Sequence, residues 1–230
     1  MRRKTTAVRI GNVVLSSEEP VLVQSMLNTS TREVDACVEQ AIRIIEAGGR
    51  LVRITAPGVK EAEMLGEIHR RLRERGYTTP ISADIHFVAE AASVAARYVE
   101  KVRINPGNFA DKRATFKKLT YTDEEYAAEL EILRQKFTEF LEVCRQYGTA
   151  VRIGTNHGSL SDRIMSRYGD TPAGMVEATM EYLRVCQACD FKDVVISLKS
   201  SDCRTMVDAV RLLVEKMEAE GMCYPLHLGV

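Results

Sequence analysis

Short apolar runs alternate along the chain with longer amphipathic stretches, and this alternation defines the predicted elements. Runs rich in Val and Ile and bounded by turn residues predict strands, whereas apolar residues at helical spacing predict helices. Predicted strands cover 21–26, 50–55, 81–86, 101–105, 150–154, 193–199 and 225–230. Predicted helices cover 32–47, 59–75, 88–98, 123–147, 172–189 and 203–220. Two short strands within 7–15, joined by the turn pair Gly11-Asn12, predict a β-hairpin in front of them.

Strand and helix alternate after the hairpin, which implies a parallel sheet. Seven strands in a chain of 230 residues fit a TIM-type barrel that lacks one unit better than an open doubly wound sheet. We therefore predict an α/β fold in which residues 1–230 form one TIM-type (β/α)8 barrel domain, truncated after the seventh strand. The two barrel edges that a missing eighth strand leaves unpaired favour association, so a homodimer is one expected state.

One face of the predicted strands is almost wholly apolar, and the other carries polar residues toward the C-terminal strand ends. Alternate residues of a strand share a face. The polar face carries Arg53, Asp84, His86, Arg103, Asn105, Arg152, Lys199 and His227. Barrels bind their ligands at the C-terminal ends of the strands, so we expect this face to line the interior and form the site.

Cations dominate that face. The tripeptide Val-Arg-Ile recurs on it around Arg53, Arg103 and Arg152. A fourth copy, around Arg9, falls in the predicted hairpin and is expected to be an ordinary exposed strand position. A buried arginine is costly unless an anion meets it, and its planar fork matches phosphate oxygens. With Lys199 added and only Asp84 opposing, the face predicts a ligand with several negative charges, such as a diphosphate.

Several roles stay open at this point. Lys199 suits a phosphate contact or a Schiff-base nucleophile, and the neighbouring arginines favour phosphate. Asp84 and His86 share a face two residues apart, which suits the orientation of hydroxyls or the transfer of a proton. An ion pair between Asp84 and one of the arginines is an equally open interpretation.

Metal-binding and redox motifs are weak in this chain. His86, His157 and His227 lie at strand ends, but their spacing is not that of metal ligands. Cys186-x-x-Cys189 closes a predicted helix and has no second pair, so we interpret it as packing thiols. We therefore predict no metal site in this chain.

Composition narrows the class of protein further. The chain has 32 basic and 32 acidic residues, so no overall charge attracts it to nucleic acid or to a membrane. Its apolar runs are far shorter than the ~20 residues that span a bilayer, and its start lacks the apolar region of a signal peptide. Six irregularly placed cysteines fit reduced thiols. We expect a cytoplasmic protein.

A series of motifs, found in order along the chain, makes a family recognisable. They are Val23-Gln24-Ser25-Met26, Ala83-Asp84-Ile85-His86-Phe87, Val102-Arg103-Ile104-Asn105-Pro106-Gly107-Asn108, Arg152-Ile153-Gly154-Thr155-Asn156-His157-Gly158-Ser159-Leu160, Lys199-Ser200-Ser201-Asp202 and Pro225-Leu226-His227-Leu228-Gly229. Together they resemble the 4-hydroxy-3-methylbut-2-en-1-yl diphosphate synthases of the methylerythritol phosphate route to isoprenoids. The 155–158 motif and the long 109–149 connection are similar to the larger form of the family, found in plants and some bacteria.

The resemblance implies an oxidoreductase acting on CH or CH2 groups. Its family opens 2-C-methyl-D-erythritol 2,4-cyclodiphosphate and removes a hydroxyl, with two electrons delivered by ferredoxin or flavodoxin through a 4Fe-4S cluster. The positions that match the family's diphosphate-binding residues are Arg53, Arg103, Arg152, Asn156 and Lys199. Those that match pocket residues, with roles left open, are Asp84, His86, Asn105 and His227.

The family's cluster is held by three cysteines and a glutamate of a C-terminal domain, and no cysteine of this chain matches them. We therefore expect the barrel part of a longer enzyme, able to bind the diphosphate but inactive alone. Two alternatives remain: a class I aldolase-like lyase with a Schiff base on Lys199, and a non-catalytic phosphate-binding barrel.

Overall fold

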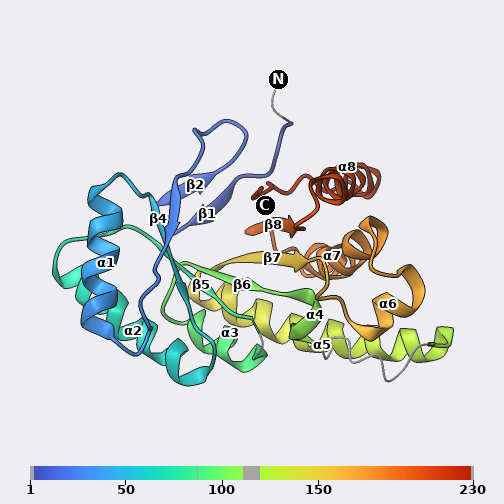
Figure 1. Cartoon of the computed structure of the whole chain (residues 1–230), viewed down its shortest axis with the longest axis horizontal. Coiled ribbons are helices and arrows are strands. Elements are labelled where there is room, and N and C mark those ends of the chain that lie inside the picture. Colours follow the sequence, from blue (N-terminus) through green and yellow to red (C-terminus); the bar gives the residue numbers. More distant parts are fainter. Residues whose placement is uncertain (1–2, 87, 111–119, 229–230) are drawn as a thin grey trace.

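Six parallel strands curl into an incomplete barrel, with helices on its outer side (Figure 1). This computed structural model describes residues 3–86, 88–110 and 120–228. The strands of the sheet, in sequence order and in spatial order, are β3 (Gln24–Met26), β4 (Leu51–Thr55), β5 (Ile81–Asp84), β6 (Lys101–Ile104), β7 (Ala150–Asn156) and β8 (Val194–Lys199). The helices are α1 (Val34–Glu46), α2 (Val59–Glu74), α3 (Ala89–Ala95), α4 (Pro106–Phe109), α5 (Asp123–Tyr147), α6 (Asp162–Tyr168), α7 (Pro172–Ala188) and α8 (Cys203–Ala219). The predicted strand and helix alternation is confirmed.

The N-terminal hairpin consists of β1 (Val8–Ile10) and β2 (Val13–Leu15), paired antiparallel. It packs against the inner face of the sheet at the N-terminal strand ends. The cluster that this contact buries comprises Val8, Ile10, Val13, Leu51, Ala150 and Val195. The hairpin therefore fills the end of the barrel opposite to the C-terminal strand ends, and Arg9 points outward, exposed as predicted.

The apolar face of each strand packs against the helices, as the strand pattern predicts. Val52, Ile54, Val102, Val151 and Ile196 are all fully buried in the main core. On the inner face, the same strands carry the polar residues at their C-terminal ends. The fold therefore separates an apolar layer under the helices from a polar interior.

Local capping explains where the long helices begin and end. The hydroxyl of Thr122 accepts a hydrogen bond from the Glu125 amide, and the Glu125 carboxylate accepts one from the Thr122 amide, so a capping box starts α5. Gly148, in the left-handed region at φ 67°, ends the helix. Thr171 caps α7, and Pro172 occupies its first turn. These boundaries are those the sequence predicts.

Two short helices were not predicted. Pro106-Gly107 reads as a turn in the sequence, but the side chain of Asn105 accepts a hydrogen bond from the Gly107 amide and starts α4 there. Ser161 caps α6 in the same way, through the amide of Ile164. Both helices follow strands β6 and β7, where they cover the ends of those strands.

The predicted strand at 225–230 is reduced to a single parallel bridge between Ile196 and Leu226. Around it the amide of Ile196 donates to the Pro225 carbonyl at 3.1 Å, and the amide of His227 donates to the Ile196 carbonyl at 2.7 Å. Residues 229 and 230 lie outside the described part. Within the described residues, the backbone of this segment hydrogen-bonds to Ile196 of β8.

The barrel is open between β3 and the segment that follows α8. A cavity of about 700 Å³ occupies this opening, bounded by the hairpin region on one side and by Pro225, Leu226 and His227 on the other. Apolar side chains border it in exposed positions, with Val21 74% and Leu228 71% exposed. No helix in the described part of the chain is both long and apolar enough to cross a membrane.

Candidate functional site

Strand register places three of the predicted site residues side by side. Asp84 of β5 pairs with Arg103 of β6, and Arg103 pairs in turn with Arg152 of β7. All three therefore lie at one level of the barrel and point to the same interior face. Arg53, on β4, lies one level lower and reaches the same point with its longer side chain.

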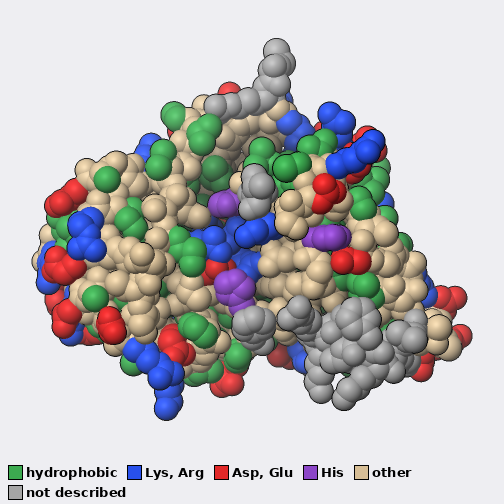
Figure 2. Space-filling view, in the orientation of Figure 1, with side chains coloured by type: hydrophobic (Ala, Val, Ile, Leu, Met, Phe, Trp, Pro, Cys, Tyr) green, Lys and Arg blue, Asp and Glu red, His purple; other side chains and the backbone are tan. Residues whose placement is uncertain are grey.

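The three arginines converge on the carboxylate of Asp84, which is fully buried. Arg53 forms an ion pair with it, Arg103 lies 3.3 Å from Oδ1, and Arg152 lies 3.8 Å from the same oxygen. We call these four residues the arginine site. Figure 2 shows Lys, Arg and His side chains gathered in the hollow at the centre of the face in view. The structure thus brings around one carboxylate three arginines that lie about fifty residues apart in the sequence.

Within the described residues, the arginines use only some of their N–H groups as hydrogen-bond donors. Arg103 donates to the Gly154 carbonyl at 2.8 Å, and Arg152 donates to the Ser197 hydroxyl at 3.1 Å. Buried donor atoms remain without a hydrogen-bond partner on each of them: Nε of Arg53, Nε of Arg103 and Nη2 of Arg152. Buried donors of this kind are costly unless a ligand accepts from them.

Gly154 makes room for this arrangement. A Cβ at this position would lie 2.5 Å from Nε of Arg103 and 3.2 Å from the Ser197 hydroxyl. Any larger residue would push Arg103 away from Asp84. The absence of a side chain at Gly154 of β7 therefore sets where the guanidinium of Arg103 lies.

The electrostatics of the site are those of an excess of buried positive charge. Burial raises the pKa of Asp84, but the charges of Arg103 and Arg53 outweigh this, and the net shift is downward. Burial, together with Arg53 and Arg103, lowers the pKa of Arg152. The site therefore holds three guanidinium groups against one carboxylate, and a bound anion would relieve their mutual repulsion.

Two further predicted diphosphate residues lie at the rim of the site. Asn156 and Lys199 pair in register at the C-terminal ends of β7 and β8. The amide oxygen of Asn156 accepts a hydrogen bond from Arg103 at 3.4 Å, which ties it to the arginine site. Lys199 is exposed, so its ammonium faces the solvent at the mouth of the barrel.

The predicted pocket residues have different surroundings. Asn105 is buried; its amide nitrogen donates to the Ser159 hydroxyl at 3.0 Å and its oxygen caps α4. His227 is half-buried, and burial together with Arg152, Lys101 and Arg53 lowers its pKa to about 4. Asn105 thus positions the loops after β6 and β7, whereas His227 faces the cations.

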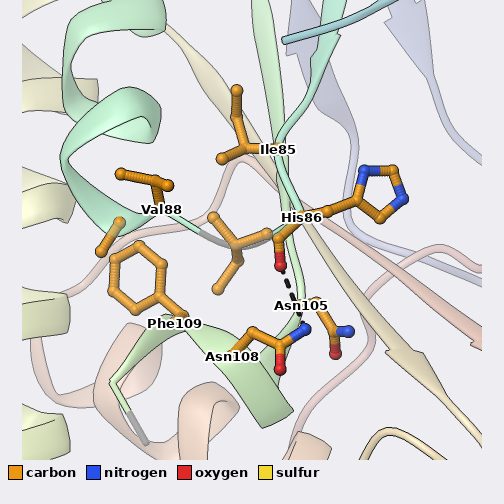
Figure 3. Close-up of a pocket in the computed structure, with 8 residues that line it drawn as sticks. Ile85, His86, Val88, Asn105, Asn108 and Phe109 are labelled. Carbon is orange, nitrogen blue, oxygen red and sulfur yellow. Dashed lines mark hydrogen bonds between the residues drawn. The ribbon is translucent and has the colours of Figure 1, made fainter. Parts of the chain in front are cut away.

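His86 lies 3.6 Å from Asp84, at the edge of the arginine site. Figure 3 shows its imidazole pointing away from the small apolar pocket formed by Ile85, Val88 and Phe109, while its carbonyl accepts a hydrogen bond from Asn108 at 3.1 Å. That pocket has a volume of about 10 Å³, too small for more than a water molecule. The chemistry of His86 therefore belongs to the arginine site.

One interior cation was not counted among the site residues. Lys101 begins β6, two residues before Arg103 on the same face, and it is buried to 2% exposure. The sequence signal for its interior position is its strand phase, since Lys101 lies two residues before Arg103 and shares its face.

The cysteines do not form a metal site in the part of the chain that the structure describes. Cys37, Cys144 and Cys186 are buried in the core, while Cys203 and Cys223 are exposed. Among these described residues, no group of three or more His, Cys, Asp or Glu side chains is arranged to hold a metal ion. The residues present therefore do not fit an iron-sulfur cluster.

Two solved structures share this fold at low sequence identity. Dihydropteroate synthase from Yersinia pestis matches 97% of this chain and 77% of its own, with a TM-score of 0.60 and 14% identity. A truncated 3-deoxy-D-arabino-heptulosonate 7-phosphate synthase from Thermotoga maritima matches 98% of this chain and 69% of its own, with a TM-score of 0.58 and 13% identity. At this identity the likeness concerns the fold alone.

Sequence relatives are much more similar. The 4-hydroxy-3-methylbut-2-en-1-yl diphosphate synthase (flavodoxin) of Parabacteroides distasonis is 60% identical over 229 residues, which cover 100% of this chain and 38% of that protein. The chloroplastic (ferredoxin) enzyme of Arabidopsis thaliana is 49% identical over 230 residues, 31% of its length. The chain thus spans about a third of the length of these relatives. The family model of the GcpE TIM-barrel domain matches residues 5–230, and the chain belongs to this family.

Proposed function

We propose that this chain is the substrate-binding barrel of a 4-hydroxy-3-methylbut-2-en-1-yl diphosphate synthase. In this proposal it binds the diphosphate of 2-C-methyl-D-erythritol 2,4-cyclodiphosphate, which the complete enzyme opens and reductively dehydroxylates to 4-hydroxy-3-methylbut-2-enyl diphosphate. The observation that carries the proposal is the convergence of Arg53, Arg103 and Arg152 on one carboxylate with buried donors left over.

The arginine site suits a diphosphate for a chemical reason. Guanidinium groups bind phosphate oxygens through paired, charge-assisted hydrogen bonds. Asn156 adds an amide beside Arg103, and Lys199 adds a cation at the mouth of the barrel. We assign to these five residues the binding and orientation of the diphosphate: Arg53, Arg103, Arg152, Asn156 and Lys199.

The polar residues beside the arginine site are suited to contact the hydroxyl-bearing part of the substrate. Asp84 holds the arginines in position, and His86 lies beside it at the edge of the site. Burial lowers the pKa of His86 more than Asp84 raises it, which keeps the imidazole neutral and able to accept a proton from a hydroxyl. His227, in the segment beside β8, faces the same cations. Asn105 orders the loops that carry these contacts.

The reduction itself requires electrons that these residues do not supply. The relatives are named as flavodoxin-dependent and ferredoxin-dependent enzymes. We propose one of these proteins as the electron donor to the complete enzyme, through a 4Fe-4S cluster held outside the described residues of this chain. The role of this chain is then to bind and orient the substrate. A cytoplasmic location and a homodimeric state stay predictions.

Calorimetry tests the proposal directly. Inorganic pyrophosphate and the cyclodiphosphate should both bind to the chain, and Arg152→Ala should weaken binding by about 2–3 kcal/mol, or roughly 30- to 150-fold, because a charge-assisted contact is lost. Arg134→Ala is the matched control, since Arg134 is exposed on α5, where it pairs with the exposed Glu131. Equal affinity of Arg152→Ala and wild type would overturn the proposal.

A further inference from the structure

Lys101 occupies an unusual position in the barrel interior. It is buried to 2% exposure, and its Nζ donates one hydrogen bond, to Oε1 of Gln24 at 3.0 Å. Gln24 belongs to β3, so the lysine side chain crosses the interior from β6 to reach it. No carboxylate within the described residues lies at ion-pair distance from Lys101.

The charges around Lys101 are mostly positive. Facing it are Arg53 from β4, Asp84 from β5, Arg152 from β7 and His227 from the segment after α8, and Arg103 follows on its own strand. Asp84 already contacts three guanidinium groups. A buried ammonium without a counter-ion, beside further cations, is too costly to persist.

A neutral amine satisfies this geometry. It donates one hydrogen to Gln24, and it lines the cavity of about 700 Å³ together with Gln24 and His227. Burial, together with the charges of Arg152 and Arg53, lowers the pKa of Lys101 well below its ordinary value. Only a new negative charge at the arginine site would change this balance.

We propose that Lys101 is a proton-accepting residue of the anion site: uncharged in the ligand-free chain, it takes up a proton when a polyanion binds to the arginine site above it. This rests on the proposed function, because it takes the arginine site as the place where the anion binds. The anion neutralises Arg53 and Arg152, so the cost of charging Lys101 falls, and the new ammonium attracts the anion in turn. Lys101 thereby becomes an additional cation of the bound state.

Anion binding and protonation of Lys101 are linked, so the affinity depends on pH in a definite direction. The complex holds a proton on Lys101 that the free chain lacks, so binding is accompanied by proton uptake and strengthens as the pH falls. Lys101→Met removes the amine and nearly preserves the length of the side chain. This variant should fold, because it replaces a buried polar group by an apolar one.

Calorimetry with inorganic pyrophosphate, at one pH in two buffers of different ionisation enthalpy, counts the protons exchanged. Wild type should take up about one proton more per pyrophosphate than Lys101→Met. Protons released by pyrophosphate itself are common to both and cancel in the difference. Lys136→Met, on the exposed face of α5, should match wild type, and the Lys101-dependent difference should persist in a His227→Gln background.

A direct measurement accompanies the variants. In wild type labelled with ¹³C-lysine, the ε-methylene resonance of Lys101 should move from the amine to the ammonium position when pyrophosphate is added. Equal proton counts in wild type and Lys101→Met, or an unchanged Lys101 resonance on binding, would overturn this inference and leave the anion site itself intact. Absence of any pyrophosphate binding by wild type would overturn the proposed function as well.

Discussion

Oδ1 of Asp84 lies 3.3 Å from Nη1 of Arg103 and 3.8 Å from Nη2 of Arg152, so one carboxylate oxygen is shared by cations of two neighbouring strands. Together with Arg53 on its other oxygen, Asp84 is the carboxylate around which the interior cations of the described residues are arranged. This sharing has consequences for stability and for ligand binding.

Asp84→Asn removes the negative charge and leaves three buried guanidinium groups without it. We expect a loss of about 3–5 kcal/mol in the free energy of unfolding, the usual cost of breaking a buried ion pair from one side. Pyrophosphate should restore more stability to this variant than to wild type, because it supplies the missing charge. Urea denaturation with and without pyrophosphate measures both effects.

The control for this variant is Asp35→Asn, which removes a carboxylate paired with Arg71 on the surface of α1. An exposed pair of this kind contributes less than about 1 kcal/mol. If the two variants lose the same stability, Asp84 does not hold the arginine site together.

Gly154→Ala should disturb the arginine site through sterics alone. The added Cβ meets Nε of Arg103 at 2.5 Å, so Arg103 must move away from Asp84. We expect a loss of about 1–3 kcal/mol in stability, typical of overpacking, together with weaker pyrophosphate binding in calorimetry. Gly66→Ala on α2 is the control, since its Cβ makes a similarly close contact, 2.9 Å from the ring of Tyr98, outside the arginine site. Equal weakening of pyrophosphate binding by both variants would contradict the argument.

His227 should make the chain sensitive to acid. Its pKa is lowered to about 4 in the folded chain, against about 6.5 when unfolded. The unfolded state binds the proton more readily between these values, so stability should be full above pH 6.5 and fall as the pH drops toward 4. Solvent screening of the half-buried ring reduces the effect to roughly 2 kcal/mol.

His227→Gln should flatten this part of the pH profile, measured by urea denaturation at several pH values. Pyrophosphate should also reduce the stability that wild type loses between pH 6.5 and pH 4, because the anion offsets the cations that repel the protonated ring. An unchanged profile in the variant would assign the acid sensitivity to other groups.

The open edge at β3 should promote association. Val23, at its start, is 56% exposed, and exposed strand edges pair readily with other chains. Val23→Lys should reduce concentration-dependent association in sedimentation velocity, because a charge on an edge opposes pairing. Val14→Lys, on the outer side of the hairpin, is the control; if both variants behave as wild type, the β3 edge is not the surface through which copies associate.

Much of the fold follows from local patterns in the sequence. The apolar phase of each strand, the capping box at Thr122 and the glycine at 148 predict the elements and their order. Strand phase also separates the interior arginines from Arg9, because alternate residues must share a face. The same reasoning missed α4 and α6, since helices of one or two turns leave little periodicity and depend on their caps.

Tertiary structure decided what these residues do to one another. Only the strand register brings Asp84, Arg103 and Arg152 to one level, and only the missing side chain of Gly154 lets Arg103 reach it. Lys101 shows the limit most clearly: its phase places it in the interior, but its lack of a counter-ion depends on which charged groups surround it. Periodicity predicts the direction of a side chain, whereas the charge state of a buried group is set by neighbours that are distant in the sequence.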